Sequence, residues 1–138
     1  MGFQYNVGLM AIRVVRLGAP RAHGEGLRLG TVRRLPRGVK KEDYAGRDLF
    51  DLWYPELAPS AALLLWVQSQ PSLDEAWAAF ARKYRSEMQQ PPARRTIGLL
   101  AALSRQADFS VGCYCEDESR CHRSLLRQLL REAGATLG

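Results

Sequence analysis

The chain has 138 residues, of which 46% are hydrophobic and 25% are charged, so its length and composition are those of one soluble globular domain. Three cysteines are too few, and odd in number, for the disulfide framework of a secreted protein. The longest apolar run, 61–67, is far shorter than the roughly 20 residues that a membrane-spanning helix needs. Composition therefore excludes the membrane, secreted and repeat classes, and we expect a cytoplasmic protein.

The net charge of +6 is concentrated at the beginning of the sequence. Residues 1–47 hold ten basic and three acidic side chains, whereas residues 48–138 hold ten basic and eleven acidic ones. Seventeen of the twenty cations are arginine, whose planar guanidinium binds phosphate or carboxylate groups through two hydrogen bonds at once. The compact basic segment 33–41 favours a phosphate-bearing partner, although arginine bias can also reflect genome composition or solubility.

The first half of the chain predicts strands and loops. Apolar and β-branched residues at 8–17 and a moderate alternation at 27–32 each predict a strand. The segment between them is rich in glycine, contains Pro20 and His23, and is typical of a loop. Residues 49–54 predict a short strand or a tight turn, which Pro55 ends.

The second half predicts helices. Ser60 precedes an apolar stretch and predicts the N-cap of a short helix that continues to about Gln68. Ser72 and Glu75 form a capping-box pattern, and apolar residues then recur at steps of three and four as far as Met88. The aromatic residues of this stripe are expected in the core. A third helix is expected after Pro91-Pro92, with Ile97, Leu100, Leu103 and Ala107 on one face.

The end of the chain predicts one more strand and one more helix. Alternation over 109–115 indicates a strand, with Phe109, Val111, Cys113 and Cys115 on one face. A last helix is expected to begin near Cys121 and to end at Gly134. Together these elements predict a single compact α/β domain over 1–138, with a small mixed sheet and helices packed on it.

One segment carries most of the reactive side chains. Residues 113–123 hold three thiols, an imidazole and two guanidinium groups, between a strand and a helix. Ligands bind at such carboxyl ends of strands in open α/β sheets. Cys121 and His122 fall at the first turn of the helix, where the dipole favours an anion or a thiolate, and Arg120 and Arg123 flank them. This pattern favours an anion or nucleophile site.

Three other interpretations of this segment remain open. Zinc has four candidate ligands in Cys113, Cys115, Cys121 and His122, although the spacing is unusual for a structural site. Cys115 and Cys121 are also candidates for a reversible disulfide. In the simplest interpretation Cys113 and Cys115 are small core residues, His122 and Arg123 bond backbone carbonyls, and nothing reacts.

Several stretches together resemble the YeaO-like family, a domain of unknown function numbered 488. The likeness covers about residues 10–134. It rests on RLPRGVKK at 34–41, where Leu35 replaces the usual Trp, on ELAPS at 56–60, and on the spacing of Trp77, Phe80 and Tyr84. Cys115-Glu116 followed by Cys121-His122-Arg123 resembles the signature of its longer branch. The resemblance implies a compact cytoplasmic α/β fold and a shared pocket marked by Arg37, Lys41, Pro59, Ser60, Cys121, His122 and Arg123.

These observations predict a protein that binds a phosphate-bearing small molecule or nucleic acid at the Cys-His-Arg site. If the site is catalytic, we expect Cys121 as the nucleophile, His122 as its base or orienting group, and Arg123 with Arg37 as an anion clamp. The full set of expected ligand-binding residues is Arg37, Lys41, Ser60, Arg120 and Arg123. The alternatives are a non-catalytic nucleic-acid module that uses the basic first third and a metal-supported structural protein. The sequence assigns no metal to the preferred site, no cofactor and no oligomeric state, and it points to no membrane partner.

Overall fold

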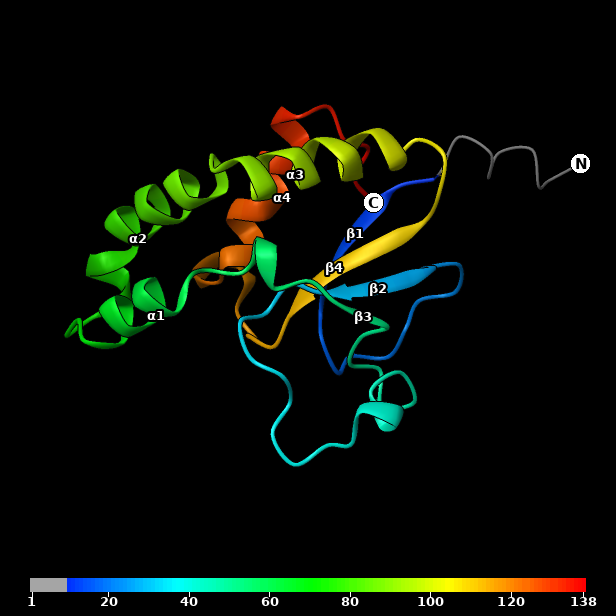
Figure 1. The fold of residues 1–138 in the computed structure, drawn as a ribbon, viewed down its shortest axis with the longest axis horizontal. Helices are drawn as coiled ribbons and strands as arrows, with labels where there is room; N and C mark the ends of the chain where they lie inside the picture. Colours follow the sequence, from blue (N-terminus) through cyan, green and yellow to red (C-terminus); the bar gives the residue numbers. More distant parts are fainter. Residues whose placement is uncertain (1–9) are drawn as a thin grey trace, which may run out of the picture.

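A parallel four-stranded sheet lies at the centre of the fold (Figure 1). The computed structural model describes residues 10–138, and its strands stand in the order β1-β4-β2-β3. Their bounds are Ile12–Arg16 for β1, Leu27–Gly30 for β2, Leu52–Trp53 for β3 and Phe109–Cys113 for β4. The predicted α/β class is confirmed. The sequence predicted a mixed sheet, but every pairing between these strands is parallel, because each connection crosses back to the same end of the sheet.

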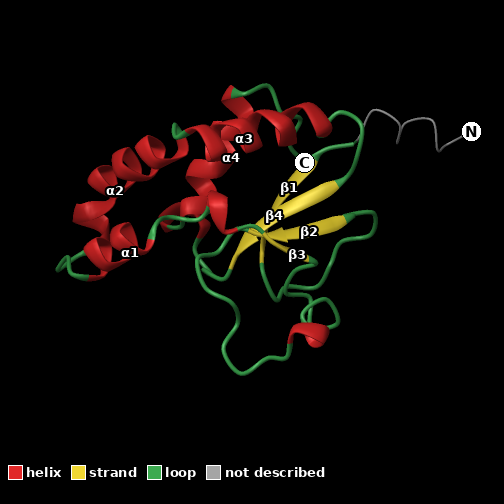
Figure 2. Ribbon diagram, in the orientation of Figure 1, coloured by secondary structure: helices red, strands yellow, loops and turns green. Residues whose placement is uncertain are grey.

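The four helices of residues 10–138 gather on one side of the sheet, and the long connection between β2 and β3 lies on the other (Figure 2). Helices α1 (Ala61–Gln68), α2 (Leu73–Met88) and α3 (Pro91–Leu103) connect β3 to β4, and α4 (His122–Glu132) follows β4. Within residues 10–138, no helix is both long enough and apolar enough to cross a membrane.

The main core lies between the helices and the sheet. The predicted stripe of α2 contributes Phe80, Tyr84 and Met88, which are buried, while Trp77 packs against them at the margin. A second, smaller core lies around the carboxyl end of β4, where Cys113 and Cys121 pack with three apolar residues, Leu17, Val32 and Phe50. Two of the three cysteines are therefore part of an apolar cluster.

Element boundaries differ from the predicted ones by a few residues. Positions 8 and 9 of the first predicted strand lie outside the described residues. The third helix ends at Leu103, so Ala107 follows it, and the last strand ends at Cys113 instead of residue 115. The strand ends early because the chain turns toward α4, and the Arg123 side chain donates hydrogen bonds to the carbonyls of Cys115 and Glu116.

A buried ion pair links β2 to β4. The Glu25 carboxylate accepts hydrogen bonds from Arg28, at 2.7 Å, and from the Ser110 hydroxyl, at 2.6 Å. Both charged side chains are almost fully buried. Burial by itself raises the pKa of Glu25, but the hydrogen bonds from Arg28 and Ser110 outweigh it and lower that pKa to about 2. The loop before β2 is therefore fixed to the centre of the sheet.

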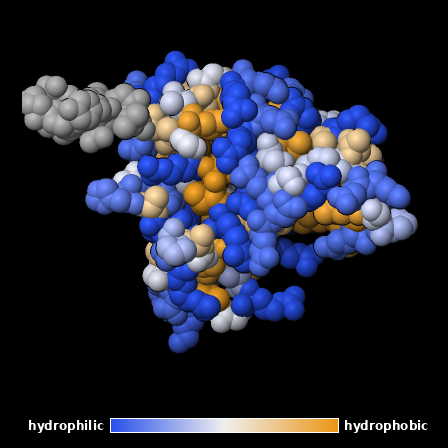
Figure 3. Space-filling view, turned by 180° about the vertical axis from the view of Figure 1, so that it is seen from behind, coloured by the Kyte–Doolittle hydropathy of each residue, from blue (hydrophilic) through white to orange (hydrophobic). Residues whose placement is uncertain are grey.

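Hydrophilic side chains cover most of the back of the molecule, and apolar ones show in patches between them (Figure 3). Among the exposed large hydrophobic residues are Leu27, Leu52 and Leu103. These three line a mainly apolar hollow of about 290 Å³ together with Tyr54 and Phe109. The first residues of β2 and β4 line this hollow. It therefore lies at the amino ends of these strands, away from their carboxyl ends.

Candidate functional site

A groove of about 240 Å³ opens at the carboxyl ends of β2 and β4. Residues that follow β2 form one part of it, and residues at the end of β4 and the start of α4 form another. We call it the strand-end groove, and its lining residues are Val32, Arg33, Arg34, Pro59, Leu64, Gln68, Cys113, Tyr114, Cys115 and His122. Parallel sheets commonly place ligands at this edge.

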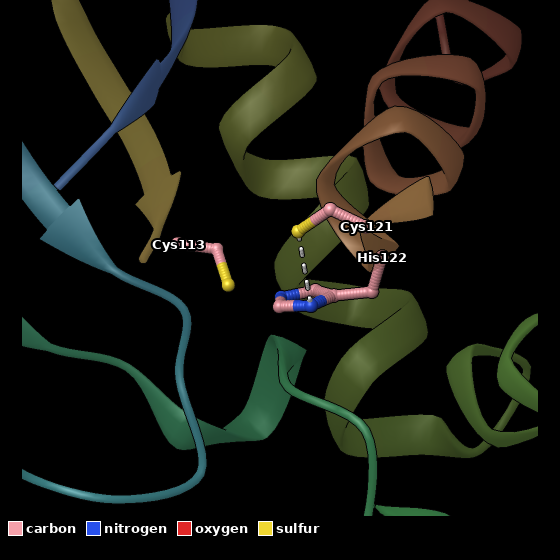
Figure 4. Close-up of side chains that lie close together, drawn as sticks. All are labelled: Cys113, Cys121 and His122. Atoms are coloured by element: carbon pink, nitrogen blue, oxygen red, sulfur yellow. Dashed lines mark hydrogen bonds between the residues drawn. The ribbon is translucent and has the colours of Figure 1, made fainter. Parts of the chain in front are cut away.

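Buried sulfur and imidazole groups converge at this end of the sheet (Figure 4), and two of their residues, Cys113 and His122, line the floor of the groove. Cys113 comes from the end of β4, and Cys121 and His122 come from the beginning of α4. One donor atom from each of these three buried residues lies within 4.8 Å of the other two. The Sγ of Cys115, in the next loop, is 3.8 Å from that of Cys113. We refer to Cys113, Cys115, Cys121 and His122 as the cysteine cluster.

The backbone explains how two adjacent residues reach the same place. Cys121 is the N-cap of α4 and is extended, with φ −123° and ψ 146°, whereas His122 is already helical. This change of conformation turns both side chains toward the end of β4 (Figure 4). The Sγ of Cys121 lies 3.9 Å from Nδ1 of His122. The unusual Cys-His spacing therefore does not prevent the two groups from meeting.

The hydrogen bonds of His122 determine which ring nitrogen carries the proton. Its Nε2 lies 2.7 Å from the Thr31 carbonyl oxygen, which can only accept, so Nε2 donates. Burial lowers the pKa of His122 to about 4, and the ring is therefore neutral at pH 7. The lone pair of Nδ1 is then left facing Cys121. This arrangement favours His122 as an acceptor or a ligand.

The three thiols differ in exposure and acidity. Cys113 and Cys121 are buried and Cys115 is exposed, and none of the three forms a disulfide. The hydrogen bond from Cys113 lowers the pKa of Cys115, and the same bond, together with burial, raises the pKa of Cys113. The two neighbouring thiols, together with burial, raise the pKa of Cys121. The predicted nucleophile Cys121 is only 2% exposed, so its geometry does not favour attack on a substrate.

Arg123 supports the loop above the cluster. The side chain is only 4% exposed, and its Nη2 donates to the carbonyl oxygens of Cys115 and Glu116. Its buried Nε has no hydrogen-bond partner within residues 10–138. Arg123 therefore holds the Cys115 backbone from within the protein, and it is not among the residues that line the groove.

Two other expected ligand residues have partners of their own. Arg120 pairs with Asp74 at 2.7 Å and lies over the Trp77 ring. Ser60 caps α1, because its Oγ accepts from the amide of Leu63, and its amide and hydroxyl both donate to Glu87. Neither residue lines the strand-end groove. Their ligand-binding roles stay predictions.

Residues of the basic segment 33–41 line two different hollows. Lys41 lines a separate hollow of about 500 Å³ with Leu35, Tyr44 and Trp53, and the exposed Arg37 lines neither this hollow nor the groove. Arg33 and Arg34 instead line the strand-end groove. Sequence reasoning did not select these two, although they closely follow the second predicted strand, which is the signal that could have indicated them.

Arg33 and Arg34 differ in the hydrogen bonds that their side chains make within the protein. Arg33 donates from Nε to the Pro59 carbonyl at 3.0 Å and from Nη2 to that of Pro55, so it fixes the turn before α1. Arg34 is exposed, and within the described part of the chain no side-chain hydrogen bond or ion pair engages it. Arg34 is therefore the cation of the groove that remains available to a ligand.

Comparison with known proteins identifies the family. The family model described as the active DUF488-N3 subclade matches residues 12–134. The chain belongs to the DUF488-N3a family. The resemblance seen in the sequence is thereby confirmed, and the cysteine cluster lies inside the region that DUF488-N3a covers. The comparisons found no match among curated proteins and none among solved structures.

Proposed function

We propose that the strand-end groove binds a phosphate-bearing small molecule of the size of a nucleotide. The observation that carries this proposal is that Arg33 and Arg34, at the end of β2, line the same groove as Cys113, Cys115 and His122, at the end of β4. An exposed guanidinium beside a strand end is suited to two-point recognition of phosphate. Arg34 is assigned the main contact because Arg33 already binds backbone carbonyls.

The remaining lining supports a ligand with both polar and apolar parts. Val32, Pro59 and Leu64 offer an apolar wall, and Gln68 offers an amide. Tyr114 also lines the groove, and its buried hydroxyl has no hydrogen-bond partner within residues 10–138. At about 240 Å³ the groove is slightly smaller than typical ligand pockets, so it would enclose only part of a nucleotide.

The neighbouring acidic residues do not oppose an anion in the groove. Glu116 pairs with Arg16, and Glu118 pairs with Arg127 at 2.7 Å. Asp117 accepts hydrogen bonds from Ser119. None of the three carboxylates lines the groove. These carboxylates are therefore already engaged, and the cations that line the groove are Arg33 and Arg34.

Calorimetric titration with AMP and with adenosine tests the proposal. We expect AMP to bind and adenosine to bind at least about tenfold more weakly, because only AMP offers the phosphate. Arg34→Ala should weaken AMP binding by about tenfold or more. Arg37→Ala is the matched control, since it removes the same charge from the same segment but not from the groove. Equal affinities for AMP and adenosine, or equal losses in the two variants, would overturn the proposal.

Nucleic-acid binding stays a prediction of the same basic segment. Arg34, Arg37 and Lys40 are exposed and lie close together in the chain, so they could contact successive phosphates. Fluorescence anisotropy with single-stranded and duplex DNA and RNA would measure it. Affinity that falls steeply with salt would support backbone contacts, and no saturable binding at low salt would remove this alternative.

A further inference from the structure

We propose that the cysteine cluster binds one zinc ion at the floor of the strand-end groove, with Cys113, Cys115, Cys121 and His122 as its ligands. The proposal goes beyond phosphate binding and does not depend on it. Three observations support it: the spacing of the donor atoms, the hydrogen bond on the far side of the imidazole, and a buried cation that lacks an acidic partner.

The donor atoms are spaced like the corners of a tetrahedral metal site. Zinc–sulfur bonds of about 2.3 Å place neighbouring sulfurs about 3.8 Å apart in a tetrahedron. The sulfurs of Cys113 and Cys115 are 3.8 Å apart, and Cys121 Sγ lies 3.9 Å from His122 Nδ1. The donor atoms of Cys113, Cys121 and His122 all lie within 4.8 Å of one another. Three donors are thus already grouped, and Cys115, whose sulfur is next to that of Cys113, would turn in from its loop to complete the tetrahedron.

The imidazole is oriented as metal-binding histidines are. Such residues donate the N–H of the nitrogen that does not bind the metal to a carbonyl or carboxylate, which fixes the ring and its tautomer. His122 meets this condition, because Nε2 donates to the Thr31 carbonyl at 2.7 Å. Nδ1 is then the free donor, and it faces the sulfur of Cys121. A histidine that merely filled the core would not need its second nitrogen aimed at a thiol.

The charge of Arg123 fits a zinc–thiolate site. Its guanidinium is buried, has no acidic partner among the described residues and leaves its Nε without a hydrogen bond. An unpaired buried charge is costly. Zinc with three thiolates and one imidazole carries a net charge of −1, opposite to that of Arg123. The same side chain holds the Cys115 carbonyl, and so positions the one ligand that comes from the loop.

The ligand set favours zinc over other divalent cations. Thiolates and imidazole are soft to borderline ligands, whereas magnesium and calcium prefer oxygen. Four protein ligands complete the tetrahedron, as in structural sites. The groove provides the path by which the ion enters.

Metal content and affinity test the proposal. The full chain, purified without a chelator and analysed by elemental analysis, should contain one zinc ion per chain. After removal of the metal, competition with a chromophoric chelator should show that Cys115→Ser binds zinc at least about tenfold more weakly, since even lost outer-shell partners cost about 10–100-fold. Cys115 is exposed, so this variant should still fold, which circular dichroism checks. His23→Ala, which changes the other histidine of the chain, should bind zinc like the unchanged protein.

Cobalt provides a readout that does not depend on any activity. Co²⁺ added to the metal-free protein should give the intense visible bands of a tetrahedral site and the near-ultraviolet bands of cobalt–thiolate bonds, and Cys115→Ser should weaken the latter. A protein that contains no zinc and takes up neither metal would overturn the proposal. So would the weak spectrum of octahedral cobalt, or equal zinc affinities in the unchanged protein, Cys115→Ser and His122→Gln.

Discussion

The Nε2 atom of His122 lies 2.7 Å from the carbonyl oxygen of Thr31, so the first residue of α4 is joined to the residue that follows β2. The Thr31 hydroxyl in turn donates to the Gly112 carbonyl of β4 at 2.9 Å. These bonds hold together three of the segments that line the strand-end groove: the residues after β2, the end of β4 and the start of α4. They also make the tautomer of His122 a direct consequence of the fold.

Histidine NMR tests this relationship. We expect the long-range ¹H–¹⁵N spectrum at pH 7 to show a proton on Nε2 of His122 and none on Nδ1, because a carbonyl can only accept a hydrogen bond. His23, the other histidine of the chain, is exposed and serves as the internal reference for the assignment. A proton on Nδ1 of His122 would contradict the arrangement.

The buried Glu25 carboxylate predicts an acid-sensitive fold. Its pKa is lowered to about 2 in the folded protein from 4.5, so its contribution to stability is present above pH 4.5 and is lost as the pH falls toward 2. A shift of this size corresponds to roughly 3 kcal/mol. The difference in the free energy of unfolding between the unchanged protein and Glu25→Gln should therefore shrink between pH 6 and pH 2. A difference that does not change with pH would contradict the role of this ion pair.

The N-cap serines of α1 and α2 should contribute differently to the free energy of unfolding. Ser60→Ala removes the acceptor for the Leu63 amide and a partner of Glu87, and should lower the free energy of unfolding by about 2 kcal/mol. Ser72→Ala removes only an exposed bond of 3.3 Å to the Glu75 amide and should cost about 0.5–1 kcal/mol. Urea unfolding measures both values. Equal losses would show that the link to Glu87 does not stabilise the turn.

Two glycines before β2 provide a matched pair. Both have positive φ, +75° at Gly24 and +78° at Gly26. A Cβ at Gly26 would lie 2.0 Å from the Asp108 carbonyl oxygen, whereas one at Gly24 would meet nothing within 4 Å. We expect Gly24→Ala to cost about 1 kcal/mol and Gly26→Ala at least about 3 kcal/mol in thermal or urea unfolding. Similar costs would contradict the close approach of this loop to the residue before β4.

Local signals in the sequence predicted the helices well. Ser60 and Ser72 were expected as N-caps, and each accepts a bond from the amide three residues later. The stripe of α2 was expected in the core, and Phe80, Tyr84 and Met88 are buried there. Both features depend on residues within a few positions of one another, so spacing alone reveals them.

The sheet and the site depend on long-range contacts that spacing does not encode. The insertion of β4 between β1 and β2 brings the end of β4 to residues about 80 positions earlier, and no local pattern indicates that pairing. The basic segment was expected to act through Arg37 and Lys41, but Arg33 and Arg34 line the groove. The meeting of Cys121 and His122 follows from the extended N-cap of α4, a backbone detail that their adjacency in the sequence conceals.

Amide chemical-shift mapping with AMP tests most directly whether the strand-end groove is the ligand site. In ¹H–¹⁵N spectra of the full chain, we expect saturable shifts that cluster at residues 32–34 and 113–115. Shifts confined to the hollow around Lys41 and Tyr44, or no saturable shift at all, would contradict it.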